Sequence, residues 1–153
     1  MLDLYNEFKQ IVNKFKENSI EYAICGGLAV TFYGYVRATV DIDMLVLSED
    51  MEESKKALRE IGYSIEATPM ELSAGKIHIE RLTKVDKESG DYLPIDLMIV
   101  TDSIRHIWQS RKQVQALDME IQVVDKKGLI ELKRMRNSAI DQEDILKLEE
   151  SDE

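Results

Sequence analysis

Residues 20–47 read IEYAICGGLAVTFYGYVRATVDIDMLVL, and this stretch decides the fold. The β-branched and aromatic residues in 20–25 predict a short strand that runs into the pair Gly26-Gly27. Residues 28–33 predict a short helix, and residues 39–47 form the strongest predicted strand of the chain. The stretch therefore predicts a unit of strand, glycine pair, helix and second strand.

Two acidic residues, Asp41 and Asp43, interrupt the apolar run of the second strand. Successive strand residues point to opposite faces, so these two share one face, with Cα atoms roughly 6.5 Å apart. Their neighbours are apolar on both faces, as in a sheet interior: Val40, Ile42, Met44, Leu45, Val46 and Leu47. An ionised carboxylate there is costly unless it is paired or binds a metal, and like charges raise each other's pKa. Two divalent ions roughly 3.5–4 Å apart, as in phosphoryl-transfer enzymes, would supply the positive charge.

Asp96 repeats this anomaly, because it is the only charged residue in the apolar strand predicted at 93–100. If that strand lies beside residues 39–47, the three carboxylates converge at one point. The alternative is that each aspartate caps a turn or pairs with a buried arginine. Three such residues in two core-like strands favour a metal site over three separate pairings.

The glycine pair Gly26-Gly27 follows a strand and precedes a helix. Backbone N–H groups at such a position can approach and bind a phosphate, helped by the N-terminus of the helix. A glycine pair alone is weak evidence, because glycine is common at tight turns. Its spacing from Asp41 and Asp43 adds weight, since one short helix later the chain returns to the same edge of the sheet.

This order strongly resembles the nucleotidyltransferase superfamily, the DNA polymerase β-like group. Its motif is a hydrophobic residue, Gly and Gly or Ser, then Asp-hydrophobic-Asp-hydrophobic about a dozen residues later; here these are Cys25-Gly26-Gly27 and Asp41-Ile42-Asp43-Met44. Residues 26–43 look most like small bacterial members, namely nucleotidyltransferases of toxin–antitoxin and abortive-infection systems and antibiotic nucleotidyltransferases. The resemblance covers most of the chain and implies an α+β fold, a small mixed β-sheet with helices packed on it.

The resemblance also implies roles for the acids. Asp41 and Asp43 would ligate Mg²⁺, with two ions expected, and the metal would bridge to the phosphates of a nucleoside triphosphate such as ATP. Asp96 would complete the metal site and help to deprotonate an acceptor hydroxyl. Mg²⁺ suits this role because it binds through a few carboxylates plus substrate phosphates. Catalysis would then depend on positioning and charge neutralisation, without a covalent protein intermediate.

Cations near the C-terminus are further candidates for the nucleotide site. Lys133 and Arg136 fall on the apolar side of the helix predicted at 126–136, and inward cations need an anion, such as a triphosphate. Small family members have a similar Leu-Ile-x-Leu-Lys segment, which makes Lys133 our choice for a phosphate contact. Alternatively, both cations pair with Asp141 and Asp144 on the last helix.

Arg37, just before the second strand, is a candidate nucleotide contact or a contact at the sheet edge.

The remaining pattern predicts one domain over residues 1–148 and an acidic, disordered tail at 149–153. Further helices are predicted at 4–15, 51–61, 103–110 and from the Ser138–Asp141 capping box to about 148, and further strands at 63–66, 76–83 and 119–124. The strands at 76–83 and 93–100 are expected to form a hairpin, because a polar turn containing Gly90 separates them.

Composition excludes several classes of protein. The net charge is −10, and it remains −6 without the four acids of the tail, which argues against gripping a long nucleic acid through its phosphates. No apolar run is long enough to cross a bilayer. Cys25 is the only cysteine, so an internal disulfide is impossible, and a reducing cytoplasm is expected.

The leading hypothesis is an Mg²⁺-dependent enzyme that moves a nucleoside monophosphate from a nucleoside triphosphate to a hydroxyl. The acceptor would be a partner protein, an RNA end or a small molecule, in a toxin–antitoxin-like setting. One alternative is an antibiotic nucleotidyltransferase of the aminoglycoside or lincosamide type, whose cationic acceptor would suit an acidic cleft. A second alternative is a catalytically inactive module of the same fold that binds a nucleotide or a partner.

Overall fold

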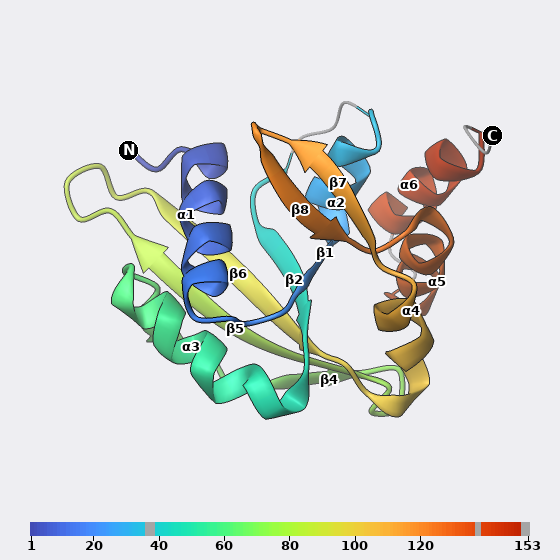
Figure 1. Cartoon of the computed structure of the whole chain (residues 1–153), viewed down its shortest axis with the longest axis horizontal. Helices are drawn as coiled ribbons and strands as arrows, with labels where there is room; N and C mark the ends of the chain where they lie inside the picture. The colour runs from blue at the N-terminus through green and yellow to red at the C-terminus, as the bar shows by residue number, and fades with distance from the viewer. Residues whose placement is uncertain (36–38, 137–138, 151–153) are drawn as a thin grey trace.

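The computed structural model describes residues 1–35, 39–136 and 139–150 (Figure 1). Within these segments the strands form one eight-stranded mixed sheet, ordered β3-β5-β6-β2-β1-β8-β7, with β4 paired to β5. The strands are β1 (Ala23–Cys25), β2 (Ile42–Val46), β3 (Ile65–Glu66), β4 (Met70–Leu72), β5 (Ile77–Val85), β6 (Tyr92–Ile99), β7 (Lys112–Ala116) and β8 (Met119–Val123). The expected α+β fold is confirmed.

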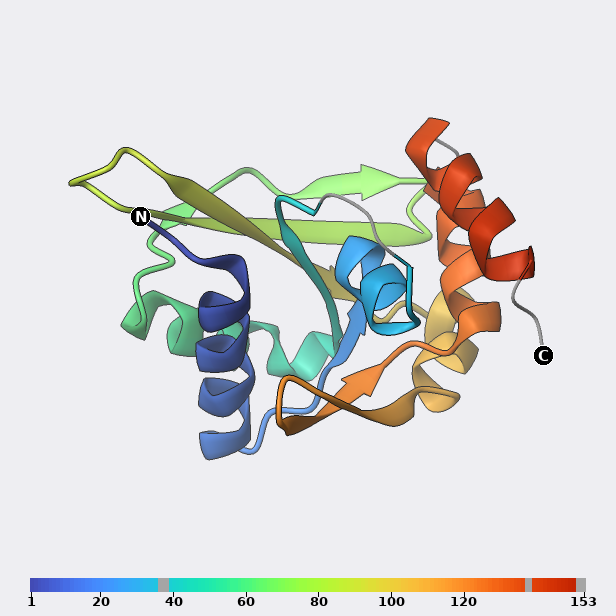
Figure 2. The same ribbon diagram turned by 90° about the horizontal axis from the view of Figure 1, so that it is seen from above.

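The helices lie on both sides of the central strands. They are α1 (Leu4–Glu17), α2 (Gly26–Phe32), α3 (Met51–Glu60), α4 (Arg105–Gln109), α5 (Lys126–Arg136) and α6 (Ala139–Glu150), with short 3₁₀ turns at Ser48–Asp50 and Asp102–Ile104. Figure 2 shows α1 and α3 on one side of β2, and α2 on the other side with α5 and α6 beyond it. The described helices have neither the length nor the apolar content that crossing a bilayer requires.

Three strand pairings position the residues of interest. β2 runs parallel to β6 with Asp43 opposite Asp96, and β1 runs antiparallel to β2 with Cys25 opposite Asp43. β5 and β6 form the expected antiparallel hairpin, with Arg81 opposite Asp96. Since directly paired residues lie on one face of a sheet, this register gathers charged side chains around Asp43 and Asp96.

Several boundaries differ from those expected. β2 begins at Ile42, so Asp41 lies just before the strand and not inside it. Helix α2 begins at Gly26, so the glycine pair forms the first turn of the helix and does not precede it. Helix α6 continues through Glu149 and Glu150, which were expected in the disordered tail; residues 151–153 lie outside the described residues.

Two strands, β4 and β7, were not expected at all. Both lie at the margin of the sheet, where β4 pairs only with β5 and β7 only with β8 in the described strand pairings. The sequence of β7, Lys-Gln-Val-Gln-Ala, has little apolar content. Because an edge strand buries little surface, its sequence need not show the apolar alternation from which strands are predicted.

Helix α1 is attached to the sheet through a buried carboxylate. Glu7 accepts hydrogen bonds from the Tyr63 hydroxyl at 3.0 Å and from the Lys84 ammonium on β5 at 2.9 Å. Asp3 caps the start of the helix by accepting from the backbone N–H groups of Tyr5 and Asn6. Burial of the charged pair beside Tyr63 makes this contact sensitive to loss of either partner.

We therefore expect Glu7→Ala to lower the free energy of unfolding by about 2–3 kcal/mol, because Lys84 and the Tyr63 hydroxyl lose their shared acceptor. Glu17→Ala, at an exposed position on the same helix, should change it by less than about 0.5 kcal/mol. Urea unfolding of the two variants and the parent measures the difference. Equal effects at the two positions would contradict this role for Glu7.

Candidate active site

Three carboxylates meet where β2 and β6 begin to pair. Asp43 lies on β2 directly opposite Asp96 on β6, and Asp41 precedes Asp43 by two residues. One oxygen of each side chain lies within 4.8 Å of the others. The convergence expected from the sequence is therefore present, although Asp41 reaches the cluster from a bend before the strand.

Burial makes this cluster electrostatically demanding. Asp43 and Asp96 are only 8% and 5% exposed, while Asp41 is partly exposed. Burial, and after it the nearby charges of Asp41 and Asp96, together raise the pKa of Asp43 to about 7. Carboxylate oxygens at this spacing are the hard donors that Mg²⁺ prefers, so the residues present fit a divalent ion.

Gly26 lies directly against this cluster. Its φ of +65° is in the left-handed region that favours glycine, and a Cβ atom built there would lie 2.1 Å from Oδ2 of Asp43. A side chain at this position would therefore collide with the carboxylate. Gly27 follows in the first turn of α2, where backbone N–H groups have no partner within the helix. Because Gly26 has no side chain, its backbone and the Asp43 carboxylate can face the same small space.

A groove of about 210 Å³ opens at this place. It brings together the glycine pair, two of the three acids and residues of the last two helices: Gly26, Gly27, Val40, Asp41, Asp43, Lys133, Arg136, Ile140 and Asp141. Residues from four separate parts of the chain thus line one surface. Arg37, the remaining candidate for a nucleotide contact, lies outside the described residues.

The structure bears on the two alternatives left open for Lys133, a phosphate contact or pairing with Asp141 and Asp144. Its side chain is 4% exposed, and its ammonium lies 3.0 Å from Oδ2 of Asp144 and 3.7 Å from Oδ1 of Asp141. It is therefore paired between α5 and α6, as the second alternative holds. It also lines the groove beside Asp43, where its charge and that of Arg136 oppose the rise in the Asp43 pKa.

Arg81 is a site residue that the sequence did not reveal. From β5 its guanidinium forms a fork on Asp96, with Nε 2.6 Å from Oδ1 and a terminal nitrogen 2.9 Å from Oδ2. The same terminal nitrogen lies 3.9 Å from Oδ2 of Asp41. One of the alternatives for the acids, pairing with an arginine, thus applies to Asp96. The hairpin was expected, but its register, which puts Arg81 opposite Asp96, could not be derived without knowing where the turn closes.

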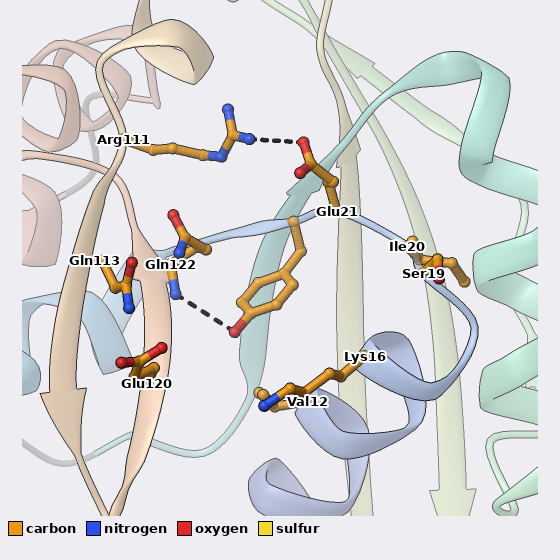
Figure 3. Close-up of a pocket in the computed structure, with 10 residues that line it drawn as sticks. Val12, Lys16, Ser19, Ile20, Glu21, Arg111, Gln113, Glu120 and Gln122 are labelled. Carbon is orange, nitrogen blue, oxygen red and sulfur yellow. Dashed lines mark hydrogen bonds and ion pairs between the residues drawn. The ribbon is translucent and has the colours of Figure 1, made fainter.

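A second and larger groove lies away from the carboxylates. It measures about 420 Å³ and lies between α1 and the β7–β8 hairpin. Arg111 extends toward Glu21 across it and binds that carboxylate at 2.7 Å (Figure 3). The Tyr22 hydroxyl accepts from the backbone N–H of Gln122 at 3.3 Å. These polar groups are bound to one another, and the lining holds no cluster of acids comparable to the carboxylate trio among the described residues.

No protein-family model matches the sequence, and no curated protein matches it. Solved structures do match. The lincosamide antibiotic adenylyltransferase LnuA, solved with lincomycin bound, superposes with a TM-score of 0.65 at 20% identity, over 94% of this chain and 95% of that one. ANT(2")-Ia in complex with adenylyl-2"-tobramycin gives a TM-score of 0.62 at 14% identity, over 94% of this chain and 85% of that one.

A protein of Thermotoga maritima assigned to the nucleotidyltransferases gives a TM-score of 0.61 at 15% identity, over 95% of this chain and 88% of that one. These identities are low, and the likeness is one of architecture. It extends over 94–95% of this chain and 85–95% of each of those chains. The chain has the nucleotidyltransferase fold.

Proposed function

We propose that the protein is an Mg²⁺-dependent nucleotidyltransferase, which transfers a nucleoside monophosphate from a nucleoside triphosphate to an acceptor hydroxyl and releases pyrophosphate. The observation that carries this proposal is the convergence of Asp41, Asp43 and Asp96 beside Gly26. A structural role alone would not account for three acids that approach so closely, because each raises the cost of ionising the others. The nucleotidyltransferase fold supports the same conclusion.

Each group has a role in this proposal. Asp41 and Asp43 would hold the divalent metal, with two ions expected, and Asp96 would complete the site and accept the proton of the acceptor hydroxyl. A bound divalent ion neutralises charge on the phosphates and fixes their position. The backbone N–H groups of the Gly26–Gly27 turn would contact the phosphates, and Lys133, which lines the same groove, would add positive charge.

The acceptor is proposed to be a small molecule that carries a hydroxyl. Two structures of the same fold bear on this: LnuA was solved with lincomycin, and ANT(2")-Ia with adenylyl-2"-tobramycin. The net charge of −10 favours a cationic acceptor over a polyanion. A partner protein or an RNA end in a toxin–antitoxin-like system is the second candidate, supported by the sequence motif.

The test is transfer of label from each α-labelled nucleoside triphosphate with Mg²⁺, using a lincosamide, an aminoglycoside and a cell extract as acceptor sources. Asp41→Asn and Asp43→Asn should each reduce transfer at least 100-fold, because the phosphates lose their metal. Asp102→Asn, at a fully exposed acid that pairs with Arg105 and is not a member of the cluster, is the matched control and should retain parent activity. Transfer that survives in the Asp41 and Asp43 variants would disprove the site assignment.

A binding-only module of this fold gives a different result in the same assay. Such a module would bind nucleotide without transferring label to any acceptor, and the Asp96→Asn change would leave binding unaltered. Under the proposal the parent transfers label to an acceptor, and Asp96→Asn removes that transfer while the protein still binds nucleotide. Isothermal titration with a nonhydrolysable triphosphate, run beside the transfer assay, separates the two functions.

Gly26→Ala tests the close approach of α2 to the acids. The added Cβ meets Oδ2 of Asp43, so we expect loss of metal-dependent nucleotide binding and a fall in stability of about 2 kcal/mol or more. Gly90→Ala is the control, because Gly90 also has a positive φ but has open space where a Cβ would lie. It should lower stability through backbone strain alone and leave binding intact. Equal loss of binding in both variants would contradict the assignment of Gly26.

The pKa of Asp43 predicts how stability depends on pH when no metal is bound. Because its pKa rises from 3.8 to about 7 on folding, its stabilising contribution is complete below about pH 4 and is lost as pH rises to about 7. Asp43→Asn removes this dependence, so in EDTA the variant should gain stability relative to the parent across that range, by an amount on the order of a few kcal/mol.

Urea unfolding in EDTA at pH 5, 6, 7 and 8 measures this difference between parent and variant. Mg²⁺ at pH 8 should restore the stability of the parent but leave that of Asp43→Asn unchanged, because the variant lacks one of the carboxylates that hold the ion. A difference in stability that stays constant over the whole pH range would contradict the raised pKa.

A further inference from the structure

Arg81 has no role in the proposed reaction, yet it is the cation in closest contact with the carboxylate trio among the described residues. Its fork engages both oxygens of Asp96 at 2.6 and 2.9 Å, and its terminal nitrogen is 3.9 Å from Asp41. Lys133, a buried cation that lines the groove beside Asp43, is paired with Asp141 and Asp144. Arg81 is therefore the residue whose charge acts most directly on the three acids.

The fork does not prevent Asp96 from binding a metal. Each carboxylate oxygen can accept more than one partner, and the fork uses one acceptor direction on each. An oxygen of Asp96 remains within 4.8 Å of ligand atoms of Asp41 and Asp43. What Arg81 adds is a fixed positive charge beside the place where a divalent ion would bind.

The charge of Arg81 has opposite effects on the free divalent ion and on the complex of that ion with a triphosphate. A free divalent ion is positive, so Arg81 repels it and also reduces the donor strength of Asp96. A complex of the ion with a triphosphate carries net negative charge, so the same guanidinium attracts it. The Arg81 side chain is 38% exposed, so solvent screens both effects without removing them.

We propose that Arg81 is an internal counter-ion that makes the trio select the metal–nucleotide complex over the free metal. It balances part of the negative charge of Asp41, Asp43 and Asp96 before substrate arrives, and so the trio does not need a resident ion. This inference rests on the proposed function, because it assumes that the acids receive a metal together with a triphosphate. Neither the fork on Asp96 nor the fold by itself requires that Arg81 control this selectivity.

Substitutions at Arg81 separate the effect of its charge from the effect of its fork geometry on metal binding. Arg81→Met removes the charge, and we expect it to bind free Mn²⁺, used as a spectroscopic substitute for Mg²⁺, about tenfold more tightly than the parent. It should bind the complex of Mn²⁺ with an α,β-methylene triphosphate several-fold more weakly. Arg81→Lys keeps the charge but not the fork, and it should retain the parent's preference. Arg59→Met, which removes an exposed arginine paired with Glu66 on another surface, is the control and should match the parent.

Binding of free Mn²⁺ is measured by electron paramagnetic resonance, and binding of the complex by calorimetry. Circular dichroism confirms that each variant is folded; if Arg81→Met does not fold, Arg81→Gln, which can still donate to Asp96, takes its place with the same expected result. Arg81→Lys behaving like Arg81→Met would overturn the proposal, because the fork and not the charge would then govern binding. So would parent-like binding in both neutral variants.

The same measurements distinguish failure of this inference from failure of the proposed function. If the parent binds the Mn²⁺ complex and Asp43→Asn does not, the metal site stands whatever the Arg81 variants do. If the parent binds Mn²⁺ neither alone nor with the triphosphate analogue, the proposed function and the role of Arg81 are both wrong.

Discussion

The parallel pairing of β2 with β6 is the constraint on which the site depends, because it puts two buried carboxylates, Asp43 and Asp96, directly opposite each other. Like charges in an apolar sheet oppose folding unless positive charge or a bound cation offsets them. The strands themselves are otherwise apolar and would pair more favourably without these acids. Retaining both acids in the sheet therefore requires compensation from neighbouring elements, and the structure supplies it on two sides.

On one side, Arg81 reaches Asp96 from the adjacent strand β5. On the other side, α5 brings Lys133 and Arg136 to the groove beside Asp43, and α6 holds Lys133 through Asp144. Gly26 contributes by having no side chain, so that the start of α2 can approach Asp43. The two terminal helices are thus part of the electrostatic environment of the acids as well as of the packing.

The sequence predicted the acids and the glycine pair because each breaks a local rule, a charge in an apolar strand or two glycines between a strand and a helix. It predicted the order of most elements because their apolar periodicity is strong. It did not predict Arg81, since the contact depends on hairpin register, nor the edge strands β4 and β7, which bury little apolar surface. The pairing of Lys133 remained open because it depends on how α6 packs against α5, a contact between elements that no local pattern specifies.

The sheet order also bears on how substrates would approach under the proposed function. In the strand order β5-β6-β2-β1, Asp43 lies on β2 and has different neighbours on its two sides. The Gly26 turn follows β1 on one side, and Arg81 lies on β5 on the other side. In-line displacement needs the attacking hydroxyl and the leaving pyrophosphate on opposite sides of the phosphorus. With the phosphates facing the Gly26 turn and α5, the acceptor would enter over β6 and β5. Asp96, the acid nearest to that side, is then the one placed to receive the acceptor's proton.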